Sequence, residues 1–196
     1  MHMIRFLKLL AFIGFAVASI LYYSCSNNEF SEDSVKTPKN IAENKNDQKF
    51  NRFGERDAQF VVDIYYRGLY QIEFAKYGKL ITKKHEVIDL ANSVITSYTV
   101  INVALKELAL KKRINLPDFL SKEEVNEIHR NAEKHETDFD QFFAEKLVED
   151  YTMEIDFIRK ASFEGNDVEL SNFFTAVETE LKEHLTMAMK IREFLK

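Results

Sequence analysis

The chain has 196 residues, of which 45% are hydrophobic and 30% are charged, and its formal net charge is -5. This length suffices for one folded domain with an extension, and five Gly with two Pro favour long helices over a turn-rich sheet protein. The acidic balance, without a cluster of Lys and Arg, excludes a nucleic-acid-binding surface, and a single cysteine excludes an intrachain disulfide.

The first residues have the layout of an export signal. Arg5 and Lys8 precede a run of apolar and small residues over 9–23, which is shorter than the roughly 20 residues of a transmembrane span. The stretch LYYSC, residues 21–25, resembles a bacterial lipobox, in which cleavage leaves Cys25 as a lipidated N-terminus. We therefore expect a lipoprotein signal peptide over 1–24 and attachment to a membrane through lipid on Cys25. An uncleaved signal anchor is the alternative.

The segment after this signal is polar and has no periodic apolar residues. Residues 26–54 are rich in Asn, Ser, Lys and acidic side chains. Such a composition does not bury enough apolar surface to fold. The sequence predicts a lipidated, disordered tether over 25–54, followed by a folded domain over 55–196.

Four long segments then show the spacing of three and four residues that is typical of amphipathic helices. They cover residues 57–81, 86–111, 138–163 and 167–195. Four such apolar stripes predict an all-α four-helix bundle. A capping box, Ser121 with Glu124, predicts a short extra helix over 121–130 between the second and third long helices. The connection over 112–136 either crosses the length of the bundle or lies across one end.

Polar residues occur on the apolar stripes near the middle of these helices. If helices of similar length pack side by side, one level contains Gly68, Tyr98, Tyr151 and His184, with Asn102 one turn from Tyr98. Because an unpaired buried polar group is costly, we expect the two phenols and the imidazole to hydrogen-bond to one another. Gly68 would leave space for the rings.

Two interpretations of this layer remain open. In the first, the polar groups form a network that fixes the register of the helices. In the second, Glu154, Glu180 and His184, with a tyrosinate, bind a divalent or ferric metal ion, or the layer lines a small pocket. The chain has no Glu-x-x-His motif, which argues against a di-iron enzyme. No cofactor is expected under the first interpretation.

The folded part resembles a bacterial family of ferritin-like envelope proteins, the domain-of-unknown-function family 4142, over about residues 57–191. The matching stretches are DAQFV at 57–61, GLYQIEFAK at 68–76, NLP at 115–117, FD at 139–140 and LKEHL at 181–185. The resemblance implies a ferritin-like fold. Tyr98 and Tyr151 stand where the family usually has histidines, Gln71 replaces a frequent Glu, and only His184 matches. Any metal site of the relatives would therefore be weakened or changed.

The sequence thus favours a lipid-anchored envelope protein that faces the periplasm or lies on the outer membrane. Its folded part is expected to be a ferritin-like four-helix bundle that acts as a non-catalytic binding or structural module. The alternative is a metal-binding ferritin-like protein with a His/Glu/Tyr site halfway along the bundle. No protein partner can be derived from the sequence.

Overall fold

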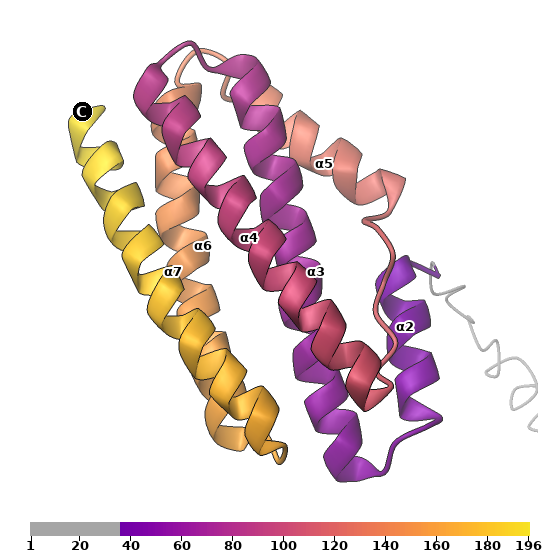
Figure 1. Ribbon diagram of the computed structural model, residues 1–196. Coiled ribbons are helices and arrows are strands. Elements are labelled where there is room, and N and C mark those ends of the chain that lie inside the picture. Colours follow the sequence, from indigo (N-terminus) through magenta and orange to yellow (C-terminus); the bar gives the residue numbers. More distant parts are fainter. Residues whose placement is uncertain (1–35) are drawn as a thin grey trace, which may run out of the picture. The chain divides into compact units, whose positions relative to one another are not determined.

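Every regular element of the described chain is an α-helix. The computed structural model describes residues 36–196, and no strand occurs in that range. The described helices are α2 (Pro38–Asp47), α3 (Arg52–Ile81), α4 (His85–Lys112), α5 (Lys122–Glu133), α6 (Phe139–Glu164) and α7 (Val168–Phe194), shown in Figure 1. The prediction of an all-α protein is confirmed. The predicted signal peptide over 1–24 and Cys25 lie outside the described residues.

Two of the long helices, α3 and α7, begin at residues whose side chains cap the helix. At the start of α3 the Asn51 side chain accepts a hydrogen bond from the Gly54 amide, so this helix begins several residues before the predicted position 57. At the start of α7 the Asp167 side chain accepts from the amides of Glu169 and Leu170, each at 3.0 Å. The carboxylate of Asp167 also complements the positive end of the helix dipole.

Two helical hairpins make up most of the protein. A short turn over 82–84 joins α3 to α4, and another over 165–167 joins α6 to α7, and each pair packs along its length. The hairpins meet where α3 contacts α6 and where α4 contacts α7, which we call the α3/α6 seam and the α4/α7 seam. Lys112 at the end of α4 lies 2.7 Å from Asp167 before α7, so these two helices run antiparallel.

The connection from α4 to α6 runs the length of the long helices. It contains α5, whose capping box between Ser121 and Glu124 is present as predicted. This helix lies along α3, because the Tyr66 hydroxyl donates to Glu124 and the Tyr77 hydroxyl donates to Glu133 at 3.0 Å. The structure therefore selects the crossing connection over one that stays at a single end, as Figure 1 also shows.

The predicted disordered tether requires a correction. Residues 38–47 form α2, which is capped by Thr37, and its Ala42 and Asn46 are buried. The Asn46 side chain donates to the Asn115 carbonyl at 2.9 Å and accepts from the Asn115 amide at 2.8 Å. Helix α2 is also joined to α3, since Lys39 pairs with Asp63 and Glu43 accepts from Gln59. Because these polar contacts rather than an apolar stripe fix α2, the composition gave no signal of it. Residues 36–196 form one compact unit, so the folded domain includes residues before the predicted start at 55.

Helix α4 is apolar enough to be compared with a membrane span. Its most apolar stretch has a mean hydropathy of 1.3, and it is the one helix within residues 36–196 that is long and apolar enough to cross a membrane. Five of its large aliphatic side chains are buried against the other helices, namely Val87, Leu90, Val94, Ile101 and Leu105, whereas Val100, Val103 and Leu110 are exposed. Burial of each large side chain stabilises the fold by about 1.5–3 kcal/mol, so core packing accounts for the inward face of α4.

Candidate functional site

Three aromatic side chains from three helices form a stack halfway along the protein. The ring centroids of Tyr98 on α4 and Tyr151 on α6 are 6.2 Å apart, and those of Tyr151 and His184 on α7 are 6.0 Å apart. The ring planes of the two pairs deviate from parallel by 8° and 22°. The structure therefore brings these three predicted residues together at one level, although they come from positions far apart in the sequence.

The polar groups of this stack do not bond to one another as expected. The Tyr98 hydroxyl donates to Glu154 Oε2 at 2.6 Å. The Tyr151 hydroxyl is buried and has no hydrogen-bond partner within residues 36–196. His184 bonds to serines of α4 instead of to either phenol. The three rings are stacked side by side, and their polar atoms point to different partners, so the expected mutual hydrogen bonding is wrong.

Both buried phenols are held in the neutral form. Burial raises the pKa of Tyr98 well above its ordinary value, and the neighbouring Glu154 carboxylate raises it further. Burial also raises the pKa of Tyr151, with the charges of Glu154, Asp150 and Glu180 acting in the same direction. A tyrosinate ligand for a metal would have to overcome this preference.

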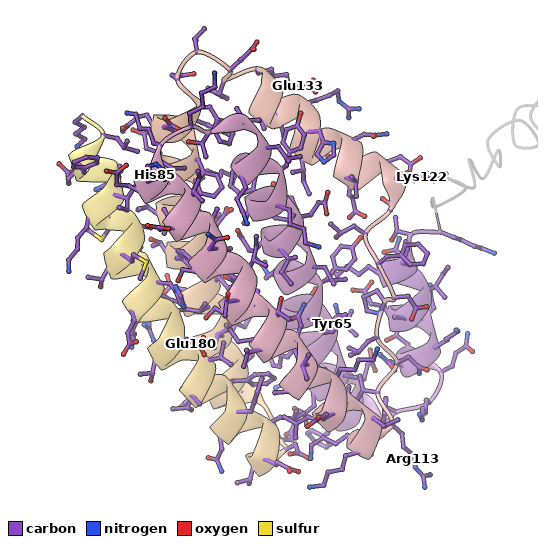
Figure 2. The ribbon with its side chains drawn as sticks, turned by 45° about the horizontal axis from the view of Figure 1, so that its top comes forward. Tyr65, His85, Arg113, Lys122, Glu133 and Glu180 are labelled. Carbon is purple, nitrogen blue, oxygen red and sulfur yellow. The ribbon has the colours of Figure 1, made fainter. Side chains whose placement is uncertain are left out.

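The α4/α7 seam contains a closed hydrogen-bonded group. His184 Nε2 lies 2.6 Å from Ser97 Oγ, and His184 Nδ1 lies 3.3 Å from Ser93 Oγ. Ser97 gives its one proton to Glu180, which Figure 2 labels on α7. The Ser97 oxygen must then accept from Nε2–H, so the network assigns the imidazole proton to Nε2 and leaves Nδ1 to accept from Ser93.

Gly68 allows α3 to approach the side chain of Asn102 on α4. A Cβ atom at position 68 would lie 2.3 Å from Asn102 Oδ1, a distance that real structures do not show. The Asn102 amide donates to the Tyr65 carbonyl at 3.2 Å, and Tyr65 is labelled on α3 in Figure 2. Gly68 thus accommodates an amide, and the expectation that it leaves space for the rings is wrong.

The three predicted metal ligands do not converge. Glu180 Oε1 and His184 Nε2 are 3.8 Å apart on α7, with Ser97 contacting both. Glu154 extends from α6 and accepts from Tyr98. No group of three or more His, Cys, Asp or Glu side chains suited to a metal ion occurs within residues 36–196.

A cavity of about 240 Å³ opens at the α3/α6 seam, and the sequence did not predict it as a whole. Four of its lining residues lie on α3 and three on α6, and they are Tyr66, Arg67, Tyr70, Gln71, Lys146, Asp150 and Glu154. Two of the seven are cationic and two are acidic. The accessible wall of the cavity is mostly apolar, and the charged and amide groups occur at a few positions of it.

The floor of this cavity has hydrogen-bond acceptors without donors. Gln71 donates through Nε2 to Asp150 Oδ2 at 3.0 Å, and Lys146 forms an ion pair with the other oxygen of Asp150. Gln71 Oε1 and Glu154 Oε1 are buried and have no hydrogen-bond partner within residues 36–196. Their side chains are 4% and 2% exposed, so water does not reach them freely. Each unpaired buried acceptor costs about 1–3 kcal/mol.

Glu154 exchanges its proton near neutral pH. Burial raises the pKa of the Glu154 carboxyl from 4.5 to about 7, while the hydrogen bond from Tyr98 and the charge of Arg67 limit the increase. A buried acid with a pKa near neutrality, at the floor of a cavity, is typical of functional sites. The arrangement can bind a group that donates hydrogen bonds, and it can bind or release a proton.

Sequence reasoning identified Glu154 and Gln71 but did not connect them with Asp150, Lys146 and Arg67. A signal was present in the spacing. Lys146, Asp150 and Glu154 follow one another at intervals of four along α6, and Arg67 and Gln71 do so along α3. Charged residues at this spacing lie on one face of a helix. The sequence alone did not reveal that the two faces point toward each other.

Comparison with known families gives one match. The family model described as "Domain of unknown function (DUF4142)" matches residues 42–191, from within α2 almost to the end of α7. No curated protein and no solved structure matches the chain. Because the family model covers most of the described helices, including those that carry the cavity and the aromatic stack, the chain belongs to the DUF4142 family.

Proposed function

We propose that this protein is a lipid-anchored envelope protein that binds a small polar ligand at the α3/α6 seam without transforming it. The observation that carries the proposal is the pair of buried acceptors, Gln71 Oε1 and Glu154 Oε1, at a cavity of about 240 Å³. A ligand that donates hydrogen bonds to both oxygens offsets the cost of leaving them unpaired.

The proposed architecture is a ferritin-like four-helix bundle. Two features support it: four long helices packed in antiparallel neighbours, and one crossing connection that runs their length. Bundles with a single long crossover are the ferritin-like type, and such bundles place ligand sites in the core between facing helices. The cavity between α3 and α6 has that position.

The lipid anchor is supported by the sequence of the first residues. Arg5, Lys8, the apolar run over 9–23 and the lone Cys25 have the order of a lipoprotein signal. We expect the expressed chain to incorporate radiolabelled palmitate and to fractionate with membranes, with the folded part on the periplasmic side or on the outer membrane. Cys25→Ser should abolish the label. Label that persists in the variant would disprove the anchor while leaving the binding proposal standing.

Binding rather than catalysis is favoured by the composition of the cavity. The Glu154 carboxyl already accepts from Tyr98, and Asp150 is engaged by Lys146 and Gln71. No serine, cysteine or histidine lines this cavity of the described chain, so a nucleophile of the Ser–His or Cys–His type is missing from its wall.

The binding proposal can be tested by screening a set of small polar fragments with NMR on the full chain in detergent. Fragments that bind should shift the backbone signals of Gln71, Asp150 and Glu154, and Gln71→Leu should weaken these shifts. Gln141→Leu is the matched control, because Gln141 Oε1 also lacks a donor within residues 36–196 but lies outside this cavity. Shifts confined to the α4/α7 seam, or none at all, would refute the proposed site.

Metal binding by Glu180 and His184, with Glu154, is the second candidate. It rests on the approach of His184 Nε2 to Glu180 Oε1 at 3.8 Å. Metal binding there would displace the Nε2 proton and the contact with Ser97, and Glu154 would have to move away from Tyr98 to join. Elemental analysis of the purified full chain would then find a divalent or ferric ion in stoichiometric amount, lost in His184→Ala. Substoichiometric metal that the variant retains would exclude this candidate.

A further inference from the structure

We infer that the ligand of the α3/α6 cavity is a small zwitterion, with an ammonium group and an anionic group joined by a short hydrocarbon chain. This inference rests on the proposed binding function and specifies the chemical class of the ligand. The inference rests on the groups that have no partner at the two ends of the cavity. These groups are hydrogen-bond acceptors at the floor and a cation at the mouth.

The floor matches an ammonium group. Gln71 Oε1 and, in the ionised form of the carboxyl, Glu154 Oε1 are both acceptors, come from facing helices, and have no donor within residues 36–196. An ammonium group supplies three donors and no acceptor, so it can satisfy both oxygens at once. A hydroxyl group has only one proton and would leave one of the two oxygens unpaired.

The mouth matches an anion. Arg67 is exposed and lies over the Phe157 ring at 4.8 Å, which positions its guanidinium. Within residues 36–196 the Arg67 guanidinium forms no ion pair with a carboxylate and acts on Glu154 only through its charge. The other cation of the lining, Lys146, is already paired with Asp150 and Glu149. A guanidinium binds a planar carboxylate through two parallel hydrogen bonds, so Arg67 is suited to the anionic end.

The charge balance and size of the cavity support a ligand with both charges. Two cations and two acids line the wall, so a ligand with a single charge would leave one end of the cavity unmatched. The rings of Tyr66 and Tyr70 also line the cavity and provide apolar surface, against which a short hydrocarbon chain can pack. A volume of about 240 Å³ limits the ligand to a small metabolite.

Calorimetric titration of the full chain in detergent tests this inference. The probes are straight-chain amino acids from glycine to 6-aminohexanoate, the alkylamine and the alkyl carboxylate of each chain length, and the chlorides of calcium and manganese. We expect one amino acid to bind at least about tenfold more tightly than both of its singly charged analogues, which is the gain expected from one additional charge-assisted hydrogen-bonded pair.

Two substitutions test which residue binds each charged group of the ligand. Arg67→Gln should reduce the affinity of the best amino acid to that of its alkylamine, and Glu154→Gln should reduce it to that of its carboxylate. Arg159→Gln is the matched control, since Arg159 pairs with Asp156 and Glu178 and does not line the cavity. Melting curves by circular dichroism establish that each variant is folded.

The remaining outcomes each reject the inference. An alkylamine, a carboxylate or a divalent cation that binds as tightly as every amino acid shows that only one end of the cavity is used. Failure of all these probes, while polar fragments still shift the signals of Gln71 and Glu154, rejects the zwitterion but retains the proposed function. Failure of both experiments rejects the two together.

Discussion

Both seams between the hairpins contain buried or partly buried polar side chains. The two seams differ in whether the polar atoms of those side chains find hydrogen-bond partners. At the α4/α7 seam the histidine, both serines and Glu180 are joined in one closed hydrogen-bonded group. At the α3/α6 seam the side chains of Gln71 and Glu154 keep an unpaired oxygen each beside a cavity. A closed polar group fixes how helices meet, whereas buried acceptors without donors carry a stability cost, which supports the proposed ligand site.

The bond between Tyr98 and Glu154 connects the two regions. Tyr98 extends from α4, which forms the closed seam, and its hydroxyl reaches the carboxyl at the floor of the open cavity. The same carboxyl therefore has one oxygen satisfied by the core and one left for a ligand. Among the substitutions at the two seams, those at Glu154 and Tyr98 should consequently have the largest effects on the free energy of unfolding.

The largest expected effect concerns the pH dependence of stability. Because burial raises the pKa of Glu154 from 4.5 to about 7, the folded state holds more protons than the unfolded state between these values. The free energy of unfolding should therefore fall as the pH rises from 4.5 through 7. The total loss from this group is about 3 kcal/mol, because a pKa difference of one between the two states corresponds to roughly 1.4 kcal/mol.

Glu154→Gln removes this titration and keeps an acceptor for Tyr98. Urea denaturation between pH 5 and pH 8 should show the wild-type chain losing stability relative to the variant as the pH rises. Asp156→Asn serves as the control for a carboxyl of α6 that is exposed to solvent. If wild type and Glu154→Gln change in parallel over this range, Glu154 is ionised at both ends of it and the argument for a neutral-pH proton fails.

The next effect separates the two buried phenols. Tyr98→Phe leaves Glu154 Oε2 without a donor, so it should lower the free energy of unfolding by about 1–3 kcal/mol. Tyr151→Phe removes a hydroxyl that bonds to nothing within residues 36–196, so its stability should stay within about 0.5 kcal/mol of wild type or rise. Equal losses in the two variants would show that the Tyr151 hydroxyl has a partner, such as a bound water.

The four long helices could be predicted because their apolar spacing follows directly from burial of one face. The same spacing predicted that Tyr98, Tyr151 and His184 meet at one level. Their hydrogen bonds could not be predicted. The actual partners are Ser97, which is next to Tyr98, and Glu154, which is one turn from Tyr151, and only the orientation of each side chain decides which of these neighbouring groups it reaches.

Two other features escaped prediction for different physical reasons. Helix α2 has almost no apolar stripe, and polar contacts hold it in place. Asn46 bonds to Asn115, which is far away in the sequence, and Lys39 pairs with Asp63. The cavity needs α3 and α6 to be neighbours, and the sequence left the order of the helices open because the connection around Pro117 permitted two paths. Knowledge of that path would have placed Gln71 opposite Asp150.

A smaller effect is expected at the closed seam. Ser97→Ala removes the hydroxyl that joins His184 to Glu180, and we expect it to lower the free energy of unfolding by about 1 kcal/mol. Ser93→Ala is the matched control, because its longer contact with His184 Nδ1, at 3.3 Å, should contribute less. Chemical denaturation of both variants measures the difference, and a larger loss from Ser93→Ala would reverse the assigned order of the two bonds.

The smallest effect on stability should come from the charged mouth of the open seam. Arg67 is exposed and forms no ion pair with a carboxylate within residues 36–196, so Arg67→Gln should change the free energy of unfolding by less than about 0.5 kcal/mol. Its charge nevertheless lowers the pKa of Glu154, and removing it should raise that pKa. Carbon-detected NMR titration of the Glu154 carboxyl measures this shift. If the pKa of Glu154 rises and the free energy of unfolding is unchanged, Arg67 acts on the cavity and not on the stability of the fold. A loss of stability comparable to that of Ser97→Ala would instead make Arg67 a structural residue, and the two seams would then not differ in this respect.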